Sequence, residues 1–192
     1  MLEKFFKTRP NFSVKDDLNT RVSKQFAPNT KIAYNPNLIS VLESEHRNLT
    51  ELYGKASMAA NAGIQHKSRL LFLEFKDRFI DNVLRQNISL YIYLQHAARP
   101  GKDRQVVTKV KAEMDMIIRE ITHFLDYSLD EGTQYDDEFL ARMEKVAKKI
   151  KQRTYTEESH VYPIYKRYGS NRKNLIWLNL VITNELSIKL GR

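Results

Sequence analysis

Four long stretches of the 192-residue chain alternate apolar and polar residues with the period of an amphipathic α-helix. In each stretch the apolar residues recur three or four positions apart, which places them on one face of a helix. Asn35-Pro36-Asn37 is a start signal before the first stretch, and Gly169 is a stop signal after the last. The spacing predicts helices over residues 38–60, 67–98, 103–129 and 136–168.

Short breaks separate these stretches, among them Arg99-Pro100-Gly101-Lys102 and Glu131-Gly132-Thr133. Long amphipathic helices joined by short loops pack as antiparallel neighbours. The sequence therefore predicts an all-α fold, an up-down-up-down four-helix bundle. Three of the five prolines lie in the first 36 residues, which show no sustained period. We divide the chain into an extended basic N-terminal arm over 1–36, the bundle over 37–169, and an extension over 170–192 with a short helix over 174–190.

Composition narrows the class of protein. With 42% hydrophobic residues, six glycines and five prolines, the chain is typical of a folded protein. It has no cysteine, which excludes disulfides, thiolate metal sites and cysteine nucleophiles. No apolar run approaches the roughly 20 residues that span a bilayer. The first seven residues lack the apolar core of a signal peptide. We expect a cytoplasmic protein without a membrane span.

A net charge of +9 indicates an acidic partner, or serves solubility alone. Basic and aromatic residues gather at the end of the fourth predicted helix, a combination typical of protein-binding hot spots. We predict a partner-binding surface there, formed by Tyr162, Tyr165, Lys166, Arg167, Tyr168, Arg172 and Lys173. A solvated helix end is the alternative interpretation. Nucleic acid is the less favoured partner, although its binding proteins also group basic residues on one face.

Polar residues interrupt the apolar faces at a comparable depth in all four helices, taking 100° per residue. A buried carboxylate needs a partner, and Arg153 lies four residues before Glu157, on the same helix face. The sequence therefore predicts a mostly polar layer inside the bundle. Its members are His46, Asn87, Tyr91, Met114, Arg153 and Glu157. The other four histidines, His66, His96, His123 and His160, are expected on the surface.

Three Glu-x-x-His pairs raise the question of a di-iron centre, because ferritin-like bundles bind iron through this spacing. The pairs are Glu43/His46, Glu120/His123 and Glu157/His160. The second of them is predicted to face solvent, and the helix over 67–98 offers no inward carboxylate at the same depth. Ferritin-like iron chemistry is therefore disfavoured.

The segment 157–163, E-E-S-H-V-Y-P, resembles the end of the last helix in hemerythrin-like (HHE) domains. The segment 42–49, L-E-S-E-H-R-N-L, resembles their first helix, with His46 at a ligand position. The resemblance covers residues 38–168 and implies a bundle built around two iron atoms. However, only His46 and Glu157 remain of six matched ligand positions, where Asn87, Tyr91, Met114 and Arg153 replace the others. Binding of a residual metal or small ligand by His46, Glu157 and Tyr91 stays open as the alternative function.

A second resemblance is to the regulator-of-sigma-D family. Residues 79–83, F-I-D-N-V, and 87–92, N-I-S-L-Y-I, are similar to its second helix, and residues 122–130 are similar to its third. This resemblance implies an anti-sigma-like regulator that grips the basic, DNA-binding part of a sigma factor. The net positive charge of this chain argues against such an electrostatic match, because the partner surface would also be basic. We predict a non-enzymatic regulator that binds a sigma factor or another regulatory protein. It is expected to use no cofactor, no metal and no catalytic residue, and its oligomeric state stays open.

Overall fold

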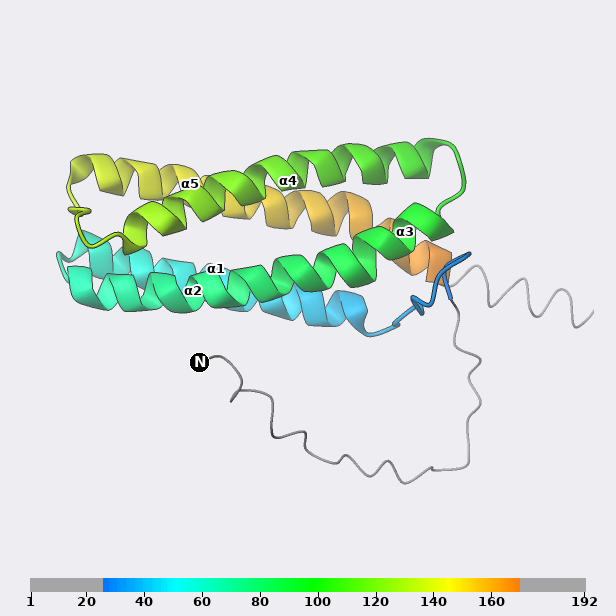
Figure 1. The fold of residues 1–192 in the computed structure, drawn as a ribbon, viewed down its shortest axis with the longest axis horizontal. Helices are drawn as coiled ribbons and strands as arrows, with labels where there is room; N and C mark the ends of the chain where they lie inside the picture. Colours follow the sequence, from blue (N-terminus) through cyan, green and yellow to red (C-terminus); the bar gives the residue numbers. More distant parts are fainter. Residues whose placement is uncertain (1–25, 170–192) are drawn as a thin grey trace, which may run out of the picture.

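The structure is a computed structural model, and it describes residues 26–169. The first part of the predicted arm and the predicted helix over 174–190 lie outside the described residues. Within the described part, four long helical rods form an all-α bundle (Figure 1). They are α1 (Leu38–Asn61); α2 (Gln65–Arg85) with η1 (Gln86–Tyr91) and α3 (Ile92–Ala97); α4 (Lys102–Leu129); and α5 (Asp137–Thr156) with η2 (Glu157–Val161) and the helical residues 162–169.

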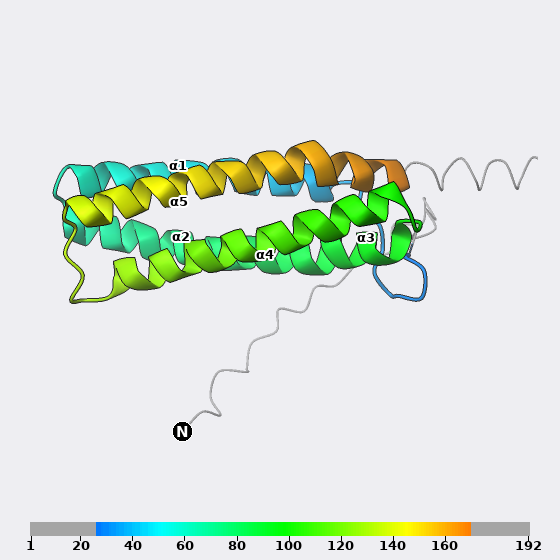
Figure 2. The same ribbon diagram turned by 90° about the horizontal axis from the view of Figure 1, so that it is seen from above.

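Consecutive rods run antiparallel, which confirms the predicted up-down-up-down bundle (Figures 1 and 2). α1 packs chiefly on α2, and α4 packs on α5, while contacts between α2 and α4 and between α1 and α5 close the bundle. All four rods begin and end within two residues of the predicted bounds. The apolar period and the turn residues were therefore sufficient to define the architecture.

Local chemistry explains two of the helix ends. Asp136 caps α5, since its side chain accepts a hydrogen bond from the amide of Phe139 at 2.9 Å. After α1 the backbone turns at Gly63 with a φ of 72°, a left-handed conformation that favours glycine. The sharp turn sends α2 back along α1.

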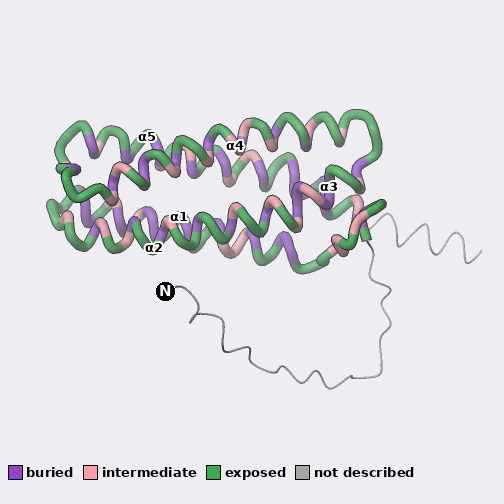
Figure 3. The backbone as a smooth tube through the Cα atoms, in the orientation of Figure 1, coloured by how far each residue is buried: buried purple, intermediate pink, exposed green. Residues whose placement is uncertain are grey.

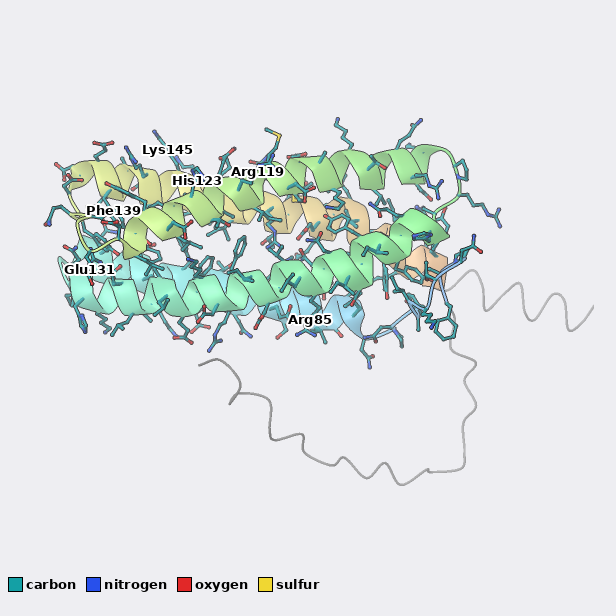
Figure 4. All side chains as sticks on the ribbon, viewed as in Figure 1. Arg85, Arg119, His123, Glu131, Phe139 and Lys145 are labelled. Carbon is teal, nitrogen blue, oxygen red and sulfur yellow. The ribbon has the colours of Figure 1, made fainter. Side chains whose placement is uncertain are left out.

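The hydrophobic core runs the length of the bundle between the four rods, where buried residues line the inner faces (Figure 3). Side chains fill this space, with Phe139 near one end (Figure 4). Aromatic rings meet edge to face there, as in the pairs of Phe72 with Tyr53 and with Phe124, whose centroids lie 5.5 and 5.6 Å apart. One continuous core indicates a single folding unit for residues 38–169.

The residues before α1 pack against the opposite end of the bundle. Tyr34 stacks on Tyr165 with ring centroids 4.9 Å apart. The Tyr165 hydroxyl accepts a hydrogen bond from the amide of Asn35 at 2.9 Å and lies 3.2 Å from the Asn35 carbonyl, to which it donates. A Cβ at Gly169 would lie 1.9 Å from the Tyr34 ring, so this close approach requires glycine. Residues 34–35 thereby hold the last turn of the fourth rod.

Candidate functional site

Two of the rods leave α-helical geometry at the level where their polar side chains meet. Both η1 and η2 are π-helical segments, in which the hydrogen bonds run from residue i to i+5. Such segments are rare and are often found at functional sites. They carry Gln86 and Tyr91 on one rod and Glu157 on the other, and these side chains are in direct contact. The polar centre of the bundle is built on the two π-helical segments.

Glu157 lies in the middle of this centre and is fully buried. Its Oε1 accepts a hydrogen bond from the Tyr91 hydroxyl at 3.0 Å, and its Oε2 accepts one from Gln86 Nε2 at 2.9 Å. His46 Nε2 and Arg153 Nη2 lie 3.4 and 3.7 Å from Oε2. Burial alone would raise the pKa of Glu157, but the charge of Arg153 and hydrogen bonds to the carboxylate outweigh it and lower the pKa. The carboxyl is therefore ionised at neutral pH.

Arg153 supplies the balancing positive charge and is itself buried. Its Nη2 donates hydrogen bonds to Asn82 Oδ1 at 2.8 Å and to Gln86 Oε1. The guanidinium carbon also lies 5.2 Å from the centroid of the Phe79 ring, a cation–π distance. Among the described residues its Nε has no hydrogen-bond partner. The Arg153 guanidinium lies beside Glu157 and balances the negative charge of that carboxylate.

The contacts of Gln86 determine the proton position on His46. Because Gln86 Oε1 accepts from Arg153, its Nε2 is the donor that faces His46 Nε2 at 3.0 Å. His46 Nε2 then accepts, and the ring proton resides on Nδ1, which donates to Glu158 Oε1 at 3.0 Å. Tyr162 closes this side, since its hydroxyl lies 3.3 Å from Gln86 Nε2. Burial and the charge of Glu157 raise the pKa values of Tyr91 and Tyr162, so both hydroxyls stay neutral, and Tyr91 donates to Glu157.

The polar centre connects to solvent along two edges. On one side, Glu158 is partly exposed and holds His46. On the other, Asn82 Nδ2 donates to Glu45 Oε2 at 2.9 Å, and Glu45 pairs with Arg85 at 2.9 Å. Apart from Arg153 Nε, the buried polar groups of the centre thus have partners out to the surface, as expected of a native polar network.

The structure brings together four of the six residues predicted for the polar layer: His46, Tyr91, Arg153 and Glu157. Asn87 does not join them. It is only partly buried, and Gln86 and Asn82 occupy the inward positions instead. The prediction for Asn87 is wrong because it followed a helix face through Val83, whereas the inward face passes through Asn82 and Gln86. Met114 is buried among apolar side chains and belongs to the hydrophobic core.

Sequence reasoning missed Asn82, Gln86 and Tyr162. A signal for the first two was present, because the run Phe72, Phe75, Phe79, Asn82 and Gln86 keeps the spacing of one helix face. The predicted face passed through Ile80 and Val83, which the structure places on the outer and lateral sides of α2. α2 is apolar on two faces, so the sequence offered two competing stripes.

The predicted partner-binding surface needs a correction. Tyr162 and Tyr165 are fully buried and belong to the core, so they are not available to a partner. Lys166 and Arg167 are exposed, and they pair with Glu43 and Asp103 at 3.6 and 2.8 Å. Tyr168 is half-buried, and its hydroxyl accepts a hydrogen bond from the amide of Arg99. Arg172 and Lys173 lie outside the described residues.

The remaining histidines, His66, His96, His123 and His160, are all exposed, as predicted. The Glu120/His123 pair faces solvent. Within residues 26–169, no group of three or more histidine and carboxylate side chains is arranged to hold a metal ion. Across the same residues, no helix combines the length and the apolarity needed to cross a bilayer.

The geometry thus shows a buried ion pair, Glu157 with Arg153, surrounded by neutral donors and by His46. Its carboxylate oxygens already have hydrogen-bond partners, and a cation stands beside them. No family of proteins matches the chain, and no curated protein or solved structure is similar to it.

Proposed function

We propose that the protein is a non-enzymatic helical bundle that acts by binding another protein, as an anti-sigma-like regulator. The observation that carries this proposal is the second apolar face of α2 and η1. Its residues, between 41 and 56% exposed, lie opposite the core at 100° per residue. We call them the outer stripe, which comprises Leu70, Leu73, Ile80, Leu84 and Ile88.

The outer stripe has the dimensions of a helix-binding site. From Leu70 to Ile88 it extends over 19 residues, about 27 Å at a rise of 1.5 Å per residue. Contiguous exposed apolar surface of this kind commonly marks an interaction site. An amphipathic partner helix recognises such a stripe through apolar anchors three or four residues apart. A protein that presents an exposed amphipathic helix is therefore the expected occupant.

The charges along the stripe favour a basic partner. Asp77 and Asp81 are exposed beside its apolar residues, and neither forms an ion pair within the described part of the chain. A second copy is a poor occupant. Antiparallel pairing about residue 79 would set Asp77 of one copy against Asp81 of the other, and like charges repel. Basic side chains on a different protein would pair with these carboxylates.

This local acidity supports the sigma-factor hypothesis. The resemblance to the regulator-of-sigma-D family implies a partner surface that is basic and binds DNA. The net charge of +9 opposes such a match only as an average over the chain. At the outer stripe the unpaired charges are the carboxylates of Asp77 and Asp81, and Asp81 belongs to one of the segments that carry the resemblance.

We expect the double variant Leu73→Ala/Leu84→Ala to bind the principal sigma factor of the same organism about thirty-fold more weakly or worse. Truncating central apolar anchors of an interface typically costs about 2 kcal/mol or more. Isothermal titration calorimetry with purified proteins measures the change. The fold should remain intact because both leucines are about half exposed.

Met116→Ala is the matched control, because Met116 is 57% exposed on α4, away from the stripe. Its affinity should equal that of the wild type. Equal binding by the double variant would place the interface elsewhere, and a wild-type protein that does not bind sigma factor would overturn the anti-sigma proposal.

A hemerythrin-like metal or small-ligand protein is the second candidate. It is favoured by His46 Nε2 and Glu157 Oε2, which lie 3.4 Å apart at positions that match metal ligands of that family. Arg153 argues against it, because its guanidinium lies 3.7 Å from the same oxygen and would repel a cation.

We therefore expect protein purified without chelators to be colourless and to hold no stoichiometric iron. Elemental analysis by mass spectrometry, together with a visible absorption spectrum, measures both properties. Two iron atoms per chain would support the hemerythrin-like candidate and contradict the proposed role of Arg153.

A further inference from the structure

A pocket of about 660 Å³ is lined by residues of the turn from α3 into α4 and of the last turn of the fourth rod. Its apolar walls include Pro28, Ala97, Ala98 and Pro100. Its polar lining comes from three separate segments. These residues are His96, Arg99, Asp103, Arg104, Arg167 and Tyr168.

The lining carries an excess of positive charge. The lining includes three arginines, Arg99, Arg104 and Arg167, and one carboxylate residue, Asp103. Asp103 Oδ1 pairs with Arg167 Nη2 at 2.8 Å, and Arg104 Nη2 donates to the carbonyl of Gln95 at 2.6 Å. The guanidinium of Arg99 makes no hydrogen bond or ion pair within residues 26–169. Three arginines and one carboxylate around the same pocket favour an anion.

The rest of the lining suits a flat apolar group. Tyr168 is half-buried, and its hydroxyl accepts from the Arg99 amide at 3.1 Å, which fixes the ring at the edge of the pocket. The alanine and proline side chains add apolar surface. The volume falls in the range of about 300–1,000 Å³ that is typical of small-molecule sites.

We propose that this pocket binds a small molecule that carries at least two phosphate charges and a flat ring, such as a nucleotide. Arginine is suited to this role because its planar fork of donors matches phosphate oxygens in pairs. Arg99 and Arg104 contact the phosphates, and Arg167 joins them in competition with Asp103. The site is separate from the buried polar centre and from the outer stripe of α2.

Calorimetric titration of the full chain at about 0.15 M salt with ATP, pyrophosphate and inorganic phosphate tests the proposal, because this salt screens non-specific attraction. We expect saturable binding of one molecule per chain, tightest for ATP and weakest for phosphate. Arg99→Gln and Arg104→Gln should each weaken ATP binding about ten-fold or more. Asp103→Asn should strengthen it several-fold, because it removes the negative charge of the lining carboxylate.

Arg119→Gln is the control, since Arg119 is an exposed arginine on α4, the helix that carries Arg104, but lies outside the pocket (Figure 4). It should bind ATP as the wild type does, and circular dichroism should show equal folding of all variants. Equal loss in Arg119→Gln, or no saturation by ATP up to millimolar concentration, would overturn the proposal. So would Arg99-dependent binding of a single-stranded oligonucleotide without binding of ATP, which would assign the patch to a polyanion.

Discussion

Replacing Arg153 with alanine is expected to lower the free energy of unfolding by about 3–5 kcal/mol, the loss typical of breaking one partner out of a buried ion pair. The side chains of Arg153 and Glu157 are only 3% and 0% exposed, so water does not replace the lost partner. Asn82 Oδ1 and Gln86 Oε1 also lose their donor. Chemical denaturation followed by circular dichroism measures the change.

Two further variants separate the ion pair from general damage. Adding Glu157→Gln to Arg153→Ala removes the stranded charge, so the double variant should lose less stability than the sum of the two single variants. Lys148→Ala, on the exposed side of α5, should change stability by no more than about 0.5 kcal/mol. A loss near zero in Arg153→Ala would mean that water reaches Glu157 in solution.

The pH dependence of stability gives an independent measure of the same pair. A carboxyl with a depressed pKa stabilises the fold at pH values above its unfolded pKa, near 4.5. This contribution is lost as the pH falls through the lower, folded pKa of Glu157. The wild type should therefore lose this stability under acid conditions, below about pH 4.5, and Glu157→Gln should lack this part of the dependence. In Arg153→Ala the pKa of Glu157 should rise, which shrinks or reverses the contribution.

The sequence was sufficient for the fold because each rod has a continuous apolar face, and the turns carry glycine, proline or an Asp cap. It was sufficient for His46, Arg153 and Glu157 because the helix before each of them is regular, so that counting 100° per residue holds. α2 was different. Its inner aromatic face and its outer stripe are both apolar, and a single predicted face drew residues from each.

Tyr162 and Tyr165 show a second limit of sequence reasoning. Tyrosines beside lysines and arginines are typical of binding surfaces, yet both rings are buried here. Their hydroxyls are satisfied by Gln86 and Asn35, which are 76 and 130 residues away in the chain. Partners at such separation come from tertiary packing, which a local pattern does not contain.

The π-helical segment η1 determines which side chains reach the polar centre. Gln86 and Tyr91, five residues apart, both point inward and both donate to Glu157. In a regular α-helix, residues five apart differ by about 140° in direction. The π-helical segment therefore accommodates one residue more than a regular α-helical turn. Because η1 takes up this extra residue, the residues after it keep facing the core.

Inserting an alanine after Ile88 should consequently exceed the one extra residue that η1 accommodates and rotate the following residues by about 100°. Tyr91 and Leu94, both buried, would leave the core, so we expect a loss of at least about 3–5 kcal/mol or failure to fold. Thermal denaturation followed by circular dichroism measures this loss. Ile88→Ala is the matched control, because it changes the same segment at a side chain that is 56% exposed, without changing the register. Its stability should stay within about 0.5 kcal/mol of the wild type. An insertion variant as stable as this control would show that the bundle accommodates a further residue here, and that the register after η1 does not depend on a single extra residue.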